Sequence, residues 1–111
     1  DLLAFLTAEP TESHDLVTAA AVLIHLRDLE PVFGQAARVL AADGVLAFTL
    51  FPAEGAAVVA DGNLYYRHPP ALVRAAAAKA GLTVELCREA VHEHQHGKPV
   101  TALLWLLRRT V

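Results

Sequence analysis

Two short apolar runs, separated by a segment of helical periodicity, constrain the fold of this chain most. Residues 15–22 (DLVTAAAV) and 45–51 (VLAFTLF) are largely apolar over a length that suits a strand buried on both faces. The segment between them carries apolar residues at helical spacing, and these form one stripe: Val32, Phe33, Ala36, Ala37 and Leu40. A strand, a helix and another buried strand in this order predict parallel strands in an α/β domain.

Punctuating residues predict where the helices begin and end. Asp28 can cap the start of the first helix, Pro31 is tolerated in its first turn, and Gly44 follows its end. A second helix is predicted over residues 69–80, started by a proline pair and stopped by glycine. Residues 53–68 contain two glycines and an asparagine, and we expect them to form a loop.

The last part of the chain predicts a hairpin. Residues 82–91 alternate between apolar and polar side chains, whereas residues 100–107 (VTALLWLL) are more uniformly apolar, as in an interior strand. The polar stretch HEHQHGKP lies between them and favours a turn, so the two strands are expected to pair antiparallel. Strand, helix, strand, helix and hairpin together predict a three-layer α/β domain.

Composition and charge exclude several classes of protein. Hydrophobic residues make up 55% of the chain and charged residues 19%, which excludes disorder as a bulk property. Uncharged runs are far shorter than the roughly 20 residues that span a bilayer, so no membrane segment is predicted. A formal charge of −3 with scattered basic residues argues against nucleic-acid binding. The single cysteine, Cys87, points to a reducing cytoplasm and is interpreted as a half-buried strand residue.

The order of these elements, together with local sequence, resembles the C-terminal half of class I S-adenosylmethionine-dependent methyltransferases, of the small bacterial type. The resemblance covers most of the chain, and its combined register is more specific than any single motif. The matching segments are Asp15-Leu16-Val17, Val22-Leu23-Ile24-His25-Leu26, Arg38-Val39-Leu40, Asp43-Gly44-Val45-Leu46, YYRHPPALVRAAAAKAGLTVELCREAV and GKPVTALLWLLRR.

The resemblance implies a Rossmann-like fold of which residues 1–111 form a partial methyltransferase domain. The chain would supply the fourth to seventh strands of that fold and two covering helices. The family's glycine-rich loop and its ribose-binding acidic residue would lie upstream, and the sequence contains no GxGxxG-type run. Because the sequence starts at Asp1 inside an amphipathic segment, we expect a fragment that is inactive alone.

By the same resemblance, several residues are candidates for the S-adenosylmethionine site. Asp1 falls at a position whose carboxylate can accept from the adenine amino group, although it can equally be a helix-capping residue. Ala19 and Ala20 end the first predicted strand, where small side chains would line the cofactor. Ala21 stands where relatives often carry an acidic residue. His25 follows in the next loop and could act as a general base, or simply pack there.

Two further groups of side chains are candidates for ligand contacts. Tyr66 and His68 precede the second helix, at a rim where the resemblance places a small-molecule acceptor; the alternative is that such loop residues seal the core. The alternating His92, His94 and His96 could share one strand face and ligate a transition metal. Because turn residues are normally solvated, these histidines are interpreted as polar turn residues, and no metal site is predicted.

Two functions from different classes follow. The first is an enzyme that transfers a methyl group from S-adenosylmethionine to a small-molecule acceptor. The alternative is a cofactor-free truncated domain that persists by self-association, because a strand edge without its neighbour exposes unpaired backbone groups. A homo-oligomer is therefore expected for this chain.

Overall fold

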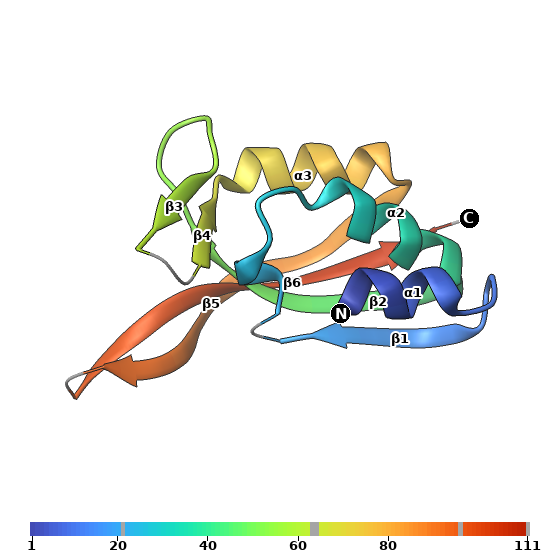
Figure 1. Cartoon of the computed structure of the whole chain (residues 1–111), viewed down its shortest axis with the longest axis horizontal. Coiled ribbons are helices and arrows are strands. Elements are labelled where there is room, and N and C mark those ends of the chain that lie inside the picture. The colour runs from blue at the N-terminus through green and yellow to red at the C-terminus, as the bar shows by residue number, and fades with distance from the viewer. Residues whose placement is uncertain (21, 63–64, 96, 111) are drawn as a thin grey trace.

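The computed structural model describes residues 1–20, 22–62, 65–95 and 97–110 (Figure 1). Helices and strands alternate in the first two thirds of the chain, and a long hairpin follows. The elements are α1 (Leu2–Ala8), β1 (His14–Ala19), the 3-10 helix η1 (Leu23–His25), α2 (Glu30–Val39), β2 (Leu40–Pro52), β3 (Val59–Asp61), β4 (Tyr65–His68), α3 (Pro70–Lys79), β5 (Leu82–Gln95) and β6 (Lys98–Arg109).

Strand β2 is the centre of the sheet. It pairs parallel with β1, from Leu16 opposite Val45 to Ala19 opposite Phe48, and antiparallel with β6 on its other side. Strand β5 continues the sheet as the antiparallel partner of β6. The two predicted features, a parallel strand pair joined through a helix and a terminal antiparallel hairpin, are both confirmed.

The core lies between this sheet and the helices. Phe33 of α2 packs on Phe48 of β2 with ring centroids 5.4 Å apart, and Phe48 stacks on Trp105 of β6 at 6.3 Å. Trp105 and Phe33 are fully buried, and Phe48 is 1% exposed. Burial of such aromatic side chains is a large contribution to stability. The pattern of apolar strands and striped helices therefore predicted the core correctly.

The layers differ from the prediction. Figure 1 shows α1, α2 and α3 on the same side of the sheet, so the described residues form two layers rather than three. Residues 15–22 were expected to be buried on both faces, but β1 ends at Ala19 and its Leu16 side chain is 58% exposed. In the described residues β1 pairs with β2 alone. Of the residues of β1, Ala19 alone is buried, so this strand is more exposed than the prediction required.

The predicted loop over residues 53–68 is wrong in part. It contains β3 and β4, which pair antiparallel with each other. Strand β4 also pairs parallel with the end of β2. Arg67 of β4 donates to Asp61 of β3 at 2.5 Å, and Phe51 packs on Tyr65 at 4.7 Å. These contacts bring the start of α3 beside the end of β2.

The ends of α2 also differ from the prediction. The helix ends at Val39 rather than just before Gly44, because Leu40 adopts an extended conformation and begins β2. Gly44 is required by a close approach instead: a Cβ there would lie 2.9 Å from the Ala41 carbonyl oxygen. At the other end, Asp28 accepts a hydrogen bond from the Glu30 amide at 3.0 Å, as expected, although Leu29 is the N-cap residue. The second helix, α3, matches its prediction closely.

None of the helices in the described ranges has the length and apolar character needed to cross a bilayer.

Candidate functional site

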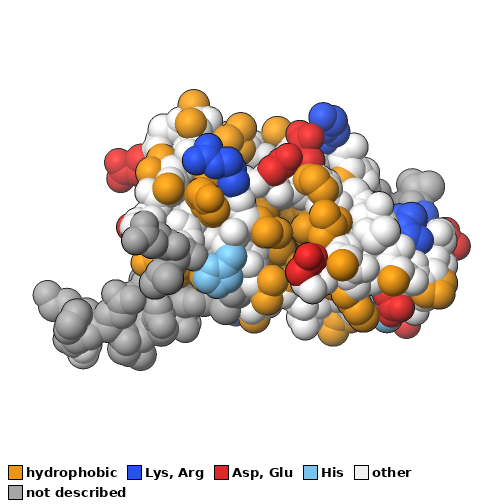
Figure 2. Space-filling model, in the orientation of Figure 1, with side chains coloured by type: hydrophobic (Ala, Val, Ile, Leu, Met, Phe, Trp, Pro, Cys, Tyr) orange, Lys and Arg blue, Asp and Glu red, His pale blue; other side chains and the backbone are white. Residues whose placement is uncertain are grey.

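A largely apolar cavity of about 400 Å³ lies where the C-terminal end of β1 meets the first turns of α1 and α2. We call it the α1 cavity. Figure 2 shows a hollow lined by hydrophobic side chains in the middle of this face of the molecule. The α1 cavity is lined by Asp1, Leu2, Leu3, Val22, His25, Leu26, Asp28, Pro31 and Val32.

A tight turn after β1 brings the predicted cofactor and catalytic residues to this place. The amide of His25 donates to the Val22 carbonyl at 3.2 Å, which closes the turn of η1. In open α/β sheets, ligands bind at the carboxyl ends of parallel strands. Asp1 and His25, which are 24 positions apart, thus line one cavity. Ala19, buried at the end of β1, and the exposed Ala20 directly precede the turn but are not among the lining residues.

The Asp1 side chain has a structural role in addition to its place at the α1 cavity. Its Oδ1 atom accepts a hydrogen bond from the Ala4 amide at 2.9 Å and caps α1. A carboxylate offers about four lone-pair sites, so capping leaves acceptor capacity for another donor. The structure therefore shows the capping role, and contact with an adenine amino group stays a prediction.

A second cavity of about 240 Å³ lies between the segment before α2, the end of β4 and helix α3. We call it the α3 cavity. Asp28 lines both cavities, so the two cavities adjoin at this residue. The α3 cavity is lined by Arg27, Asp28, Leu29, Glu30, Val58, His68, Leu72, Val73, Ala75, Ala76 and Lys79.

His68 is the only buried polar or charged residue among those described, with 2% of its surface exposed. Neither of its ring nitrogens reaches a hydrogen-bond partner of normal geometry in the described part of the chain. Burial lowers the pKa of His68, while the backbone at Leu26 and Arg27 opposes this shift. Among backbone groups only a carbonyl oxygen favours the protonated imidazole, so this opposing influence comes from the Leu26 and Arg27 carbonyl groups. His68 is therefore held mainly in its neutral form.

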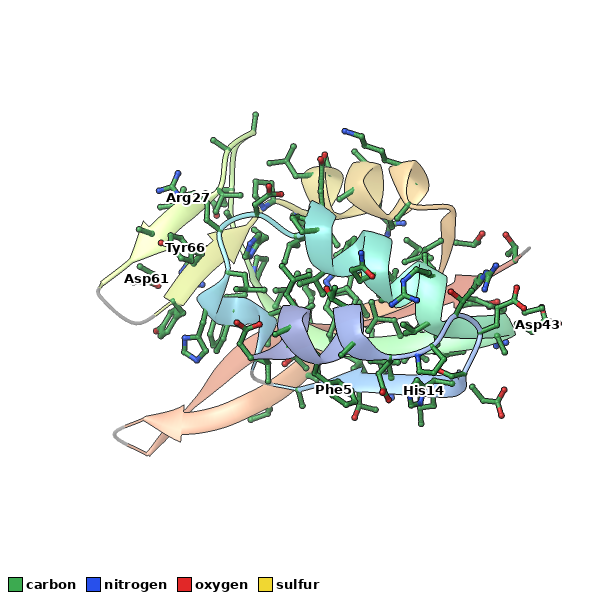
Figure 3. The ribbon with its side chains drawn as sticks, turned by 45° about the vertical axis from the view of Figure 1, so that its right-hand side comes forward. Phe5, His14, Arg27, Asp43, Asp61 and Tyr66 are labelled. Atoms are coloured by element: carbon green, nitrogen blue, oxygen red, sulfur yellow. The ribbon has the colours of Figure 1, made fainter. Side chains whose placement is uncertain are left out.

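Tyr66 lies next to the α3 cavity without lining it. The guanidinium carbon of Arg27 lies 5.3 Å from the centre of the Tyr66 ring, and Figure 3 shows the two side chains adjacent. Such a stacked arrangement is a cation–π contact. The two residues predicted to bind the acceptor thus differ in their surroundings. His68 lines the α3 cavity, whereas Tyr66 contacts Arg27, which lines it.

Several charged residues around the α3 cavity carry no motif in the sequence. Lys79 of α3 pairs with Glu30 of α2 at 3.2 Å, and both residues line this cavity. The pairing joins residues 49 positions apart, so no local pattern predicts it. The sequence signal that existed was the histidine before the proline pair, His68.

The remaining candidates do not form a site in the described residues. No group of three or more potential metal-ligating side chains occurs among them. The side chains of His92, His94 and His96 lie outside the described residues. Cys87 is half-buried in β5, as interpreted from sequence, and burial raises the pKa of its thiol despite the nearby Arg74.

Comparison with known proteins identifies the class to which this fold corresponds. Residues 4–48 match the family model of a methyltransferase domain. No curated protein sequence matches the chain significantly.

Solved structures agree with the family match. A S-adenosylmethionine-dependent methyltransferase from Methanosarcina mazei superposes with a TM-score of 0.72 at 12% identity, over 94% of this chain and 63% of that one. The 1,6-didemethyltoxoflavin-N1-methyltransferase of Burkholderia thailandensis gives 0.73 at 14% identity, over 96% and 48%. A S-adenosylmethionine-dependent methyltransferase from Mesorhizobium loti gives 0.68 at 17%, over 91% and 64%.

The fold is the Rossmann-like α/β fold of class I methyltransferases, and the resemblance predicted from sequence is confirmed. The chain spans about half to two thirds of the length of these solved structures.

Proposed function

We propose that this chain is part of a S-adenosylmethionine-dependent methyltransferase that acts on a small-molecule acceptor. The observation that carries the proposal is the α1 cavity, which lies at the carboxyl end of the parallel pair β1–β2. Most of its lining falls within residues 4–48, the part that matches the methyltransferase family model. One structural neighbour binds S-adenosylhomocysteine.

The residues of the α1 cavity fit part of this cofactor. Leu3, Val22 and Val32 provide apolar walls for an aromatic base, and the Asp1 carboxylate is an acceptor for its exocyclic amino group. The small side chains of Ala19 and Ala20 permit a close approach at the strand end. The cavity volume of about 400 Å³ is within the usual range of ligand sites, about 300–1,000 Å³.

The chemistry divides between the cofactor and the chain. When bound, S-adenosylmethionine supplies an electrophilic methyl group. We assign to His25, exposed beside the α1 cavity, the role of the base that takes a proton from the acceptor. Alignment of the acceptor contributes as well, and we assign that role to Tyr66 and His68.

S-adenosylhomocysteine is expected to bind this chain weakly and at the α1 cavity. Titration followed by ¹H–¹⁵N NMR should shift the amides of Leu3, Val22 and Val32 at millimolar ligand, while calorimetry detects no heat. The Asp1→Asn variant keeps the cap, since asparagine is a good N-cap residue, but loses the carboxylate. Its affinity should fall about five-fold, the effect of losing one hydrogen bond of about 1 kcal/mol.

The Asp43→Asn variant is the matched control, because Asp43 lies at the far end of the molecule from the α1 cavity (Figure 3). It should bind like the native chain. An equal loss of affinity in both variants would show that the Asp1 carboxylate does not contact the ligand. Shifts that are absent at the α1 cavity, or centred elsewhere, would contradict the proposed function.

The second candidate function, self-association, is favoured by the exposed apolar residues around β1. Leu16 is 58% exposed on β1, and Phe5 of α1 is 54% exposed with its ring 6.5 Å from that of His14. A strand edge of this kind favours pairing with a second copy. We therefore propose a homodimer through β1.

Light scattering should report a dimer that Leu16→Glu converts to a monomer, because a buried unpaired carboxylate is costly. Val59→Glu, at an exposed residue of β3 away from β1 (Figure 1), is the control and should stay dimeric. A native chain that stays monomeric at all concentrations would contradict this candidate.

A further inference from the structure

We propose that the α3 cavity binds a neutral, single-ring compound whose hydroxyl group donates a hydrogen bond to His68. The inference deepens the proposed function by naming the chemical class of the methyl acceptor, and it rests on the proposed function only in that step. Binding to the cavity itself depends on the residues that line it.

The His68 ring is buried beside the α3 cavity. The side chain is 2% exposed, lines the α3 cavity, and has no normal hydrogen-bond partner at either ring nitrogen in the described ranges. Buried polar atoms are nearly always paired, and exceptions point to a functional group or a missing partner. A polar ligand in the cavity would supply that partner.

The neutral ring determines which ligand group fits. A neutral imidazole has one N–H donor and one acceptor nitrogen. Both ring nitrogens of His68 are buried without a hydrogen-bond partner of normal geometry in the described residues, so its acceptor nitrogen requires a donor from the ligand. A hydroxyl group meets this requirement.

Charged side chains of both signs line the α3 cavity in equal number. Arg27 and Lys79 are basic, Asp28 and Glu30 are acidic, and Lys79 pairs with Glu30. Arg27 lies over the ring of Tyr66. The lining therefore carries no net charge, so an ionised ligand would be desolvated without an excess of opposite charge to offset the cost. A neutral ligand avoids that cost.

The α3 cavity is small and much of its wall is apolar. Leu29, Val73 and Ala76 contribute apolar surface around His68, in a cavity of about 240 Å³. An apolar cavity of about 150 Å³ in another protein is large enough to bind benzene. The α3 cavity therefore has room for one substituted ring and its hydroxyl group.

Phenol and toluene are the probes that test the inference, since they differ in the hydroxyl group alone at nearly equal size. Titrated into the purified chain without cofactor, phenol should shift the amides of Leu29, Val73 and Ala76 and a ring ¹⁵N resonance of His68. Its affinity should exceed that of toluene about five- to ten-fold, and benzoate should not saturate. Equal affinities for phenol and toluene, or phenol shifts centred on the α1 cavity, would overturn the proposal.

The His68→Phe variant keeps a ring of similar size and removes both nitrogens. It should bind toluene as the native chain does and lose the preference for phenol, whereas His14→Phe, on β1 and outside the α3 cavity, should keep it. A His68→Phe chain that still prefers phenol overturns the proposal. Where that variant does not fold, the phenol-to-toluene ratio of the native chain and the His68 ring shift decide the question.

The outcome is separable from that of the proposed function. Phenol binding together with the absence of S-adenosylhomocysteine binding would retain the cavity assignment and contradict the proposed function. Binding of S-adenosylhomocysteine without any phenol preference would support the proposed function and overturn the assignment of the α3 cavity.

Discussion

Replacing Arg38 by methionine is expected to lower the free energy of unfolding by about 2–4 kcal/mol and to release helix α1. Arg38 lies at the end of α2, and its guanidinium group reaches back to the end of α1. It donates to the carbonyl oxygens of Leu6 and Glu9, both at 2.8 Å, and to the Thr11 hydroxyl at 3.0 Å. Hydrogen bonds from a charged donor are each stronger than neutral ones, although their contributions do not add.

The effect should be concentrated in α1 because this helix has little stability of its own. It has 7 residues, and isolated helices of that length are not stable in water. The Asp1 cap, the burial of Leu6 and the Arg38 guanidinium at the carbonyl end hold it in place. A cation at that end also interacts favourably with the helix dipole. Loss of the Arg38 guanidinium should therefore raise the rate of amide hydrogen exchange in Leu2–Ala8 more than in the rest of the chain.

Two variants control for the loss of a charge. Arg38→Lys keeps the charge but cannot span three acceptors, so it should recover less than half of the lost stability. Lys79→Met removes a surface pair with a side chain 72% exposed, and should cost no more than about 0.5 kcal/mol. Unchanged exchange in α1 of Arg38→Met would contradict this account. Because Asp1, Leu2 and Leu3 line the α1 cavity, the same variant should also weaken S-adenosylhomocysteine binding.

The elements that sequence predicted are those whose signals are local. The apolar stripe of α2, the run that became β2 and the terminal strands all carry their periodicity within a few residues. Strands β3 and β4 were missed because they have 3 and 4 residues, carry mixed polar and apolar side chains, and lie among glycines. Their stability comes from pairing with each other and with the end of β2, which no local pattern contains.

The site was predictable to a lesser degree for the same reason. Asp1, His25 and His68 were selected from their positions relative to predicted elements, and each one lines a cavity. The cavities themselves depend on packing between segments that are distant in sequence. Leu29 and Val73, for example, line the same cavity. Arg38 lies in a segment that carries the methyltransferase resemblance. Its contacts with residues about 30 positions earlier could not be inferred from that local pattern.

The stability of the chain is expected to fall between neutral and mildly acidic pH because of His68. Burial lowers the pKa of His68 below its ordinary value of 6.5 in the folded state. Above pH 6.5 both folded and unfolded chains carry the neutral imidazole, and its contribution to stability is fully present. As the pH falls below 6.5, the unfolded chain takes up a proton that the folded chain does not. Stability then decreases by up to about 1.4 kcal/mol per pH unit, until the folded-state pKa is passed.

Urea unfolding at pH 7.5, 6.5 and 5.5 measures this slope directly. His68→Gln removes the titrating group, so its unfolding free energy should vary less with pH than that of the native chain. Parallel curves for His68→Gln and the native chain would contradict the assignment. Since a hydroxyl ligand needs the neutral imidazole as its acceptor, bound phenol should lower the pKa of His68 in the folded state further and so extend the decrease in stability to lower pH.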